Sequence, residues 1–97
     1  MKNLKNLSIL LVEDEIFLRR EIAAFLEIYC DRVTEAADGL EALERFNAQP
    51  PDLVISDIRM PQMNGLELAA RLKELSPETP VILCTAFTET FFGYDGN

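Results

Sequence analysis

Hydrophobic and polar positions along the chain fall into blocks that predict strands and helices in alternation. Runs of consecutive apolar residues are typical of strands covered on both faces, and they occur at Ser8–Val12, 53–56 and Val81–Cys84. A shorter alternating segment at 32–35 is more typical of an edge strand. With the helical segments between them, the order is βαβαβαβ, which predicts a parallel sheet with right-handed crossovers.

Three segments between the strands carry apolar residues at helical spacing. The stripes expected to face the core are Leu18, Ile22, Phe25, Leu26 and Tyr29 in the first, Leu40, Leu43 and Phe46 in the second, and Leu68, Leu72 and Leu75 in the third. Asp38 and Asn64 each precede a glutamate by three positions, so we expect both to cap the helices that follow.

Composition narrows the class of protein. The chain of 97 residues is 48% hydrophobic and fits one folded domain over residues 1–97. Its net charge of −8 argues against binding to nucleic acid or to anionic membranes. Apolar runs are too short to span a bilayer, and the N-terminus does not resemble a secretory signal.

Side-chain chemistry adds to this picture. The sequence has two cysteines and no histidine, which excludes histidine-based triads and most zinc sites. We expect Cys30 at the end of a helix and Cys84 inside a buried strand, both reduced in a cytoplasmic protein. Arg19 and Arg20 are expected to form a solvated helix face.

Polar residues at the ends of three predicted strands form a candidate site. Glu13 and Asp14 follow the first strand, Asp57 ends the third, and Thr85 follows the fourth. The carboxyl ends of parallel strands meet at the edge where ligands bind. Two carboxylates about 4 Å apart repel by roughly 4 kcal/mol at an effective dielectric near 20, so a hard divalent cation is the simplest way to hold them together. Asp57 could then attack phosphorus, and the Thr85 hydroxyl could hydrogen-bond a phosphoryl oxygen.

Four segments closely resemble the receiver domain of two-component response regulators: 11–15, 37–43, 57–67 and 85–86. The most specific is Asp57-Ile58-Arg59-Met60-Pro61-Gln62-Met63-Asn64-Gly65, which matches the family pattern Asp-x-x-Met-Pro-x-Met-x-Gly. The resemblance implies an α/β fold, a doubly wound flavodoxin-like parallel sheet with strand order 2-1-3-4. It also implies a CheY-like signalling module in a two-component phosphorelay.

Roles follow from the resemblance at the matching positions. Asp57 would accept the phosphoryl group from a sensor histidine kinase. Glu13 and Asp14 would bind Mg²⁺, and Asp57 and the backbone carbonyl of Arg59 would complete the ligand set. Thr85 would contact the phosphoryl group and start a switch in partner interactions. Such a domain is not an enzyme beyond its own phosphorylation and dephosphorylation.

The sequence departs from the family pattern after about Ala86. Receivers continue with a helix, a strand that carries a lysine, and a final helix, whereas the lysines here are Lys2, Lys5 and Lys73. We therefore expect a receiver truncated after about Ala86 that lacks the usual final α-β-α segment, with 87–97 as an atypical tail. Its fourth strand and first helix would then be exposed apolar surface, which favours a homodimer or a partner that completes the domain.

Other interpretations stay open. An incomplete receiver could act as a non-switching interaction or dimerisation module, because the lysine is missing. A phosphohydrolase of the haloacid-dehalogenase type is disfavoured, since that class places a second Asp where Arg59 stands. Asp57 could merely cap a turn, Glu13 and Asp14 could complement a helix dipole, and Thr85 could be an ordinary strand residue.

Overall fold

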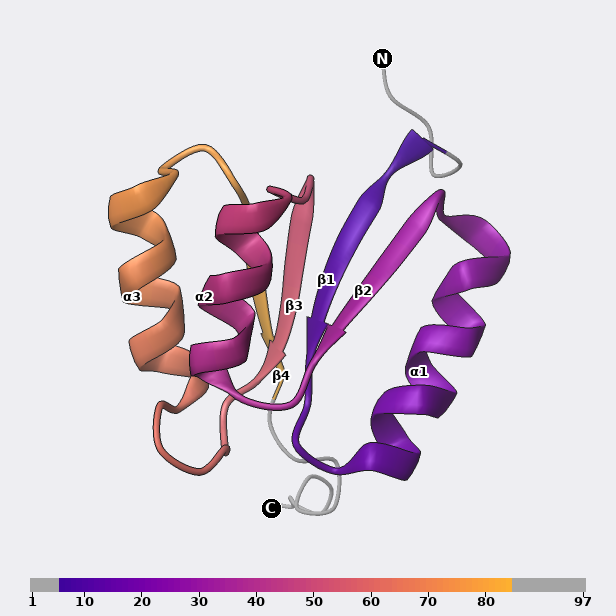
Figure 1. The fold of residues 1–97 in the computed structure, drawn as a ribbon, viewed down its shortest axis with the longest axis horizontal. Helices are drawn as coiled ribbons and strands as arrows, with labels where there is room; N and C mark the ends of the chain where they lie inside the picture. The colour runs from indigo at the N-terminus through magenta and orange to yellow at the C-terminus, as the bar shows by residue number, and fades with distance from the viewer. Residues whose placement is uncertain (1–5, 85–97) are drawn as a thin grey trace, which may run out of the picture.

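The computed structural model describes residues 6–84, and every statement about structure below concerns that range. A four-stranded parallel sheet is covered by α1 on one face and by α2 and α3 on the other (Figure 1). The elements are β1 (Ser8–Val12), α1 (Ile16–Tyr29), β2 (Arg32–Ala36), α2 (Gly39–Ala48), β3 (Leu53–Asp57), α3 (Gly65–Leu75) and β4 (Val81–Cys84).

The strand order is β2-β1-β3-β4, as the resemblance implied. β1 lies between β2 and β3, with Leu10 opposite Thr34 on one side and Val54 on the other. The chain leaves β1 toward one face of the sheet and leaves β3 toward the opposite face (Figure 1). This reversal makes the carboxyl ends of β1 and β3 the topological switch point, where open α/β sheets bind ligands.

Helix caps form where the sequence predicts them. Asp38 Oδ1 accepts from the backbone N–H of Glu41 at 2.8 Å, and Asn64 Oδ1 accepts from that of Glu67 at 2.9 Å. The Glu41 carboxylate reaches back to the N–H of Ala37 at 2.7 Å, one residue before the cap itself. Both caps orient the starts of α2 and α3 at the carboxyl edge of the sheet.

The main core lies between the sheet and the pair α2 and α3. Its buried members are Leu10, Val12, Ala36, Ala42, Phe46, Val54, Met63, Leu68 and Leu72. β1 is buried from Ile9 to Val12, which confirms that its apolar run is covered on both faces, whereas Leu53 and Ile55 on one face of β3 are only partly buried. None of the helices in residues 6–84 has the length and apolar character needed to cross a membrane.

Some predicted core positions are exposed instead. Leu40 lies about 160° around α2 from the buried Ala42, on the opposite side of the helix, and Leu75 is in the last turn of α3. On α1 the inward residue is Ala23, while Phe25 and Tyr29 are exposed and pack edge-to-face on each other. Alanines occupy buried positions in α1 and α2, at Ala23 and Ala42.

The prediction that Cys84 is buried in its strand is wrong. Cys84 and Ile82 are exposed, whereas Val81 packs against the core on the other side of β4. The reason is that α1 packs mainly against β1 and β2, so it does not seal this side of β4. Cys30 is partly buried just after α1. The expected absence of a final α-β-α segment and the tail at 87–97 concern residues outside the described range.

Gly65 allows α3 to start close against the end of β3. Its N–H donates to the Ile58 carbonyl at 2.8 Å. A Cβ added at Gly65 would meet the backbone carbonyl oxygen of Asp57 and lie 2.9 Å from the Ile58 Cα. The glycine in the Met-Pro-x-Met-x-Gly segment is therefore required by backbone packing directly behind Asp57.

We predict that Gly65→Ala lowers the free energy of unfolding by about 1–3 kcal/mol, because the new methyl group overlaps backbone atoms that cannot rotate away. Gly39→Ala is the comparison variant, since Gly39 is also the first residue of a capped helix but its added Cβ would overlap the side chain of Met63, 2.8 Å from Met63 Cβ, and not the backbone. Urea denaturation should show the smaller loss for Gly39→Ala. Equal losses in the two variants would contradict this account of Gly65.

Candidate functional site

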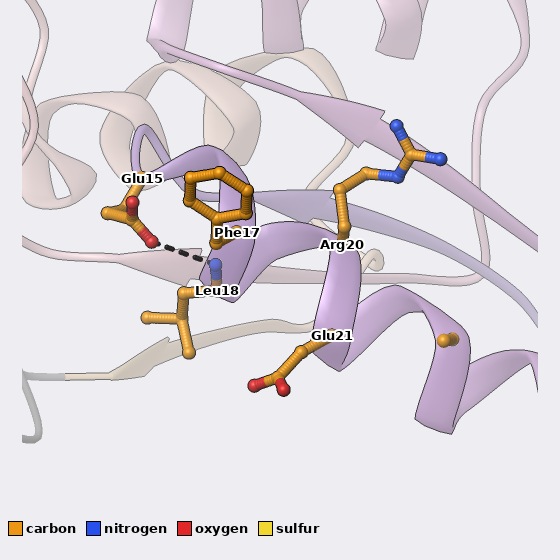
Figure 2. Close-up of a pocket in the computed structure, with 6 residues that line it drawn as sticks. Glu15, Phe17, Leu18, Arg20 and Glu21 are labelled. Atoms are coloured by element: carbon orange, nitrogen blue, oxygen red, sulfur yellow. Dashed lines mark hydrogen bonds between the residues drawn. The ribbon is translucent and has the colours of Figure 1, made fainter.

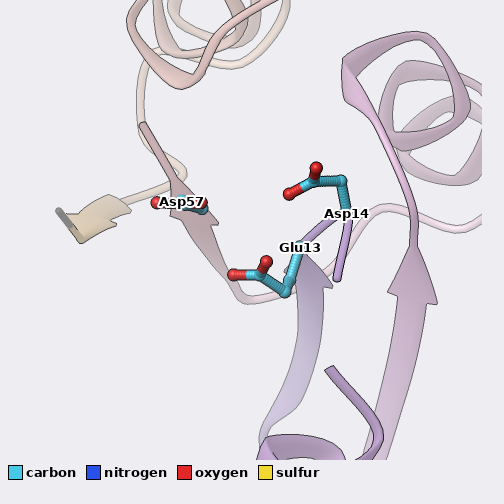
Figure 3. Close-up of side chains that lie close together, drawn as sticks. All are labelled: Glu13, Asp14 and Asp57. Atoms are coloured by element: carbon cyan, nitrogen blue, oxygen red, sulfur yellow. The ribbon is translucent and has the colours of Figure 1, made fainter. Parts of the chain in front are cut away.

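Three carboxylates meet at the carboxyl edge of the sheet. Glu13 and Asp14 directly follow β1, and Asp57 is the last residue of β3 (Figure 3). One carboxylate oxygen from each lies within 4.8 Å of the others. The carboxylates of Glu13 and Asp14 point toward Asp57 in this view. The sequence prediction that these three side chains lie together is confirmed.

The backbone around Glu13 is held by neighbours on both sides. Its N–H donates to the Ala36 carbonyl at 3.0 Å, which extends the pairing of β1 with β2 by one residue. Its side-chain Oε2 accepts from the N–H of Glu15 at 3.0 Å. Glu15 in turn caps α1, because its Oε1 accepts from the N–H of Leu18 at 2.8 Å. The acidic loop is thus fixed between a strand pair and a helix start.

Burial and nearby negative charge perturb the titration of Glu13. Its residue is only 5% exposed, and the pKa is raised from 4.5 to about 7. Burial is the largest cause, and the charges of Asp57 and Asp14 add to it, while the hydrogen bond from Glu15 acts in the opposite direction. Near neutral pH, the site therefore carries a proton or needs a positive charge.

Asp57 is buried at 9% exposure, and its pKa is also raised. Burial is the main cause, and it is opposed by the backbone N–H groups of Arg59 and Ile58 and by the Arg59 charge. One oxygen, Oδ1, is fully covered and has no hydrogen-bond partner among the described residues. A buried anionic oxygen without a donor is costly, which marks it as a ligand position.

The donor set suits a hard divalent cation. It consists of carboxylate oxygens, the ligands preferred by Mg²⁺ and Ca²⁺, and the Asp57 carboxylate among them has an unpartnered oxygen. A cation at this position would lower the raised pKa of Glu13, since it favours the ionised carboxylate. The residues present therefore fit a metal site.

Two predicted roles at the site are not tested by the described residues. Thr85 and the neighbouring Ala86 lie outside the described residues. Arg59 is exposed two positions beyond β3, and its positive charge acts on Asp57, as noted above. The proposed role of the Arg59 carbonyl as a metal ligand stays a prediction.

Arg19 was expected on a solvated face, and that prediction is wrong. Its side chain is 13% exposed, and its Nε lies 2.9 Å from Glu35 Oε1 on β2. Its Nη1 donates to the backbone carbonyl of Glu13 at 3.0 Å. Arg19 precedes Ala23, the buried residue of α1, by one helical turn, so both lie on the inward face of the helix. Arg20, at 70% side-chain exposure, matches the prediction.

One surface depression lies away from the carboxylates. It measures about 580 Å³ and lies along the first turns of α1, beside the highly exposed Phe17 (Figure 2). A smaller cavity of about 210 Å³ adjoins the acidic site and is lined by Glu13, Asp57, Ile22 and Cys84 among others. Burial and the charges of Asp57 and Glu13 raise the pKa of the Cys84 thiol, which disfavours its reactive thiolate.

The stability of the metal-free protein should depend on pH because of the titration of Glu13. The folded state keeps a proton on Glu13 up to about pH 7, while the unfolded chain releases it near 4.5. Between these values stability falls as pH rises. The free energy of unfolding of wild type, compared with that of Glu13→Gln, should fall by up to about 3 kcal/mol between these pH values, at about 1.4 kcal/mol for each unit by which the pKa is raised. Urea denaturation in a chelator would measure it, and a difference that does not change with pH would contradict the assignment.

The chain is similar to proteins of one known family. Residues 9–94 match the family described as "Response regulator receiver domain". The chemotaxis protein CheY of Listeria monocytogenes is 38% identical over 81 residues, which cover 82% of this chain and 68% of that protein. The response regulator receiver protein CpdR of Brucella abortus is 36% identical over 89 residues, or 92% of this chain and 74% of the relative.

Solved structures agree with these sequence matches. Chemotaxis protein CheY4 of Vibrio cholerae superposes with a TM-score of 0.76 at 32% identity, covering 80% of this chain and 67% of that one. A response regulator receiver domain protein from Clostridium thermocellum gives 0.77 at 32% identity, covering 81% and 64%. The chain belongs to the response regulator receiver domain family, the CheY-like signalling domains of two-component systems.

Proposed function

We propose that this domain accepts a phosphoryl group on Asp57 from the phosphohistidine of a sensor histidine kinase, in a reaction that depends on Mg²⁺. The observation that carries the proposal is the buried carboxylate of Asp57, which has one unpartnered oxygen, Oδ1, and lies with two further carboxylates in a cluster whose ligand oxygens are within 4.8 Å of one another. Phosphoryl transfer requires mainly positioning and charge stabilisation, and this site supplies groups for both.

In the proposed transfer, an Asp57 carboxylate oxygen forms a bond to phosphorus while the bond from phosphorus to the histidine nitrogen breaks. The product is an acyl phosphate on Asp57, and the released imidazole takes up a proton from solvent. The nucleophile must be ionised, and the backbone N–H groups of Arg59 and Ile58 favour that form against the effect of burial.

Glu13, Asp14 and Asp57 would hold the cation. When bound, Mg²⁺ supplies positive charge that offsets the negative charge on the transferring phosphoryl group. The Arg59 carbonyl and the Thr85 hydroxyl are proposed as further contacts, the first to the metal and the second to the phosphoryl group. The Glu15 N–H and the Arg19 guanidinium keep the Glu13 carboxylate and backbone in place.

Phosphorylation of Asp57 would change the surface that partners contact, so we propose a signalling role in the cytoplasm and no catalysis beyond the domain's own phosphorylation and dephosphorylation. The assembled acidic site favours this role over a non-switching interaction module. A pure interaction module has no need to hold an unpartnered buried carboxylate beside two others, because such a cluster costs stability.

We predict that a small phosphodonor such as acetyl phosphate adds one phosphoryl group to wild-type protein when Mg²⁺ is present. Intact-protein mass spectrometry should show the added mass, and a chelator should abolish it. Asp57→Asn should stay unmodified because it lacks the nucleophile. Asp31→Asn makes the same chemical change at an exposed position and should be modified like wild type. A phosphoryl group retained in Asp57→Asn would overturn the proposal.

Asp14→Asn should weaken Mg²⁺ binding by at least about tenfold, because loss of groups that merely orient metal ligands already costs about 10- to 100-fold. Isothermal calorimetry on the metal-free protein measures this directly. Asp31→Asn removes the same charge away from the site and should change the affinity by less than about twofold, since exposed charges are screened by salt. Equal effects in the two variants would mean that net charge, not ligation, governs binding.

A further inference from the structure

One guanidinium joins three elements beside the acidic site. Arg19 projects from α1, pairs with Glu35 of β2 at 2.9 Å and donates to the backbone carbonyl of Glu13 at 3.0 Å. Its side chain is 13% exposed, so these contacts are largely shielded from water. The second Glu35 oxygen lies 3.8 Å from the exposed Arg20. Glu35 therefore orients Arg19, and Arg19 contacts the residue that begins the acidic loop.

The contact to Glu13 completes a set of three anchors. The N–H of Glu13 donates to Ala36, its side chain accepts from Glu15, and its carbonyl accepts from Arg19. The first two anchors come from the backbone of neighbouring segments. Of the three partners of Glu13, Arg19 alone contributes a side chain, so its contact is the one that a substitution can remove without changing Glu13 itself.

We propose that Arg19, oriented by Glu35, is a positioning residue that holds the loop with Glu13 and Asp14 in the geometry for binding a divalent cation. The proposal rests on the metal-dependent function proposed above. Without this donor, the loop can rotate about the Glu13 carbonyl, and the two carboxylates lose their fixed relation to Asp57. A guanidinium suits this role because its planar fork donates to two acceptors at once, whereas the ammonium of lysine is a point charge on a flexible stem.

A positioning role and a purely electrostatic role for Arg19 predict opposite changes in Mg²⁺ affinity when the residue is replaced. Arg19 is positively charged, so by charge alone its removal should tighten the binding of a cation to nearby carboxylates. If Arg19 positions the loop, its removal should weaken that binding. Arg20 is the matched control, because it is the next residue of the same helix, carries the same charge and is 70% exposed.

The experiment is a Mg²⁺ titration by isothermal calorimetry at a pH above the pKa of Glu13, with wild type, Arg19→Met and Arg20→Met. Groups that orient metal ligands typically contribute about 10- to 100-fold to affinity. Arg19→Met should therefore bind Mg²⁺ about tenfold more weakly than wild type. Arg20→Met should bind as tightly as wild type or slightly more tightly. Circular dichroism at the titration temperature establishes that each variant is folded.

Two milder variants keep the test decisive if Arg19→Met does not fold. Glu35→Gln removes the charge that orients Arg19 but keeps its size, and Arg19→Lys keeps the positive charge but loses the fork. Both should weaken Mg²⁺ binding by several-fold. By charge alone, Glu35→Gln would also weaken binding, since it removes an anion, so Arg19→Lys is the variant that separates positioning from charge.

Folded Arg19→Met or Arg19→Lys protein that binds Mg²⁺ as tightly as wild type would overturn the positioning role. In that case wild type would still bind Mg²⁺ and accept phosphate on Asp57, so the proposed function would stand. A wild type that fails to bind Mg²⁺ would overturn both, and the two outcomes are therefore distinguishable.

Discussion

Mutual repulsion among Glu13, Asp14 and Asp57 is the constraint around which the rest of this domain is organised. Burial at the edge of the sheet strengthens the repulsion and raises the pKa of Glu13 and of Asp57. Asp14 is exposed to solvent, whereas Glu13 and Asp57 are buried and so bear most of the cost of the repulsion. Here the backbone is fixed by strand pairing and by hydrogen bonds to Glu13, so the cluster persists and favours a cation.

The fold supplies that rigidity mainly from the α2 and α3 side. Leu10, Val12 and Val54 of β1 and β3 pack in one core with these helices, which fixes the two strands that carry the acids. Gly65 lets α3 begin in contact with the backbone of Asp57 and Ile58, so the strand end cannot shift away from the helix. The opposite face is less filled, since only Ala23 of α1 is buried. The packing that holds β1 and β3 therefore also fixes the positions of the acidic residues at their ends.

Arg19 links this less filled face to the site. It connects α1 to β2 through Glu35 and to the acidic loop through the Glu13 carbonyl. A buried ion pair of this kind contributes little to stability by itself, because desolvation offsets the attraction. The pair acts instead by orientation, because Glu35 holds the Arg19 guanidinium where it donates to the carbonyl of Glu13.

The sequence by itself determined the element order, the strand order through a resemblance, the two helix caps and the meeting of Glu13, Asp14 and Asp57. These features depend on local periodicity and on the rule that parallel strands end at one edge, so each can be recognised in a short stretch of sequence. The tertiary structure decided which stripe residues are buried, because helical spacing does not tell how far a helix extends over its sheet. It placed Leu40, Phe25 and Cys84 at the surface and Arg19 largely inside. The partner of Arg19 lies on another strand, and contacts between distant segments exist only once the chain has folded.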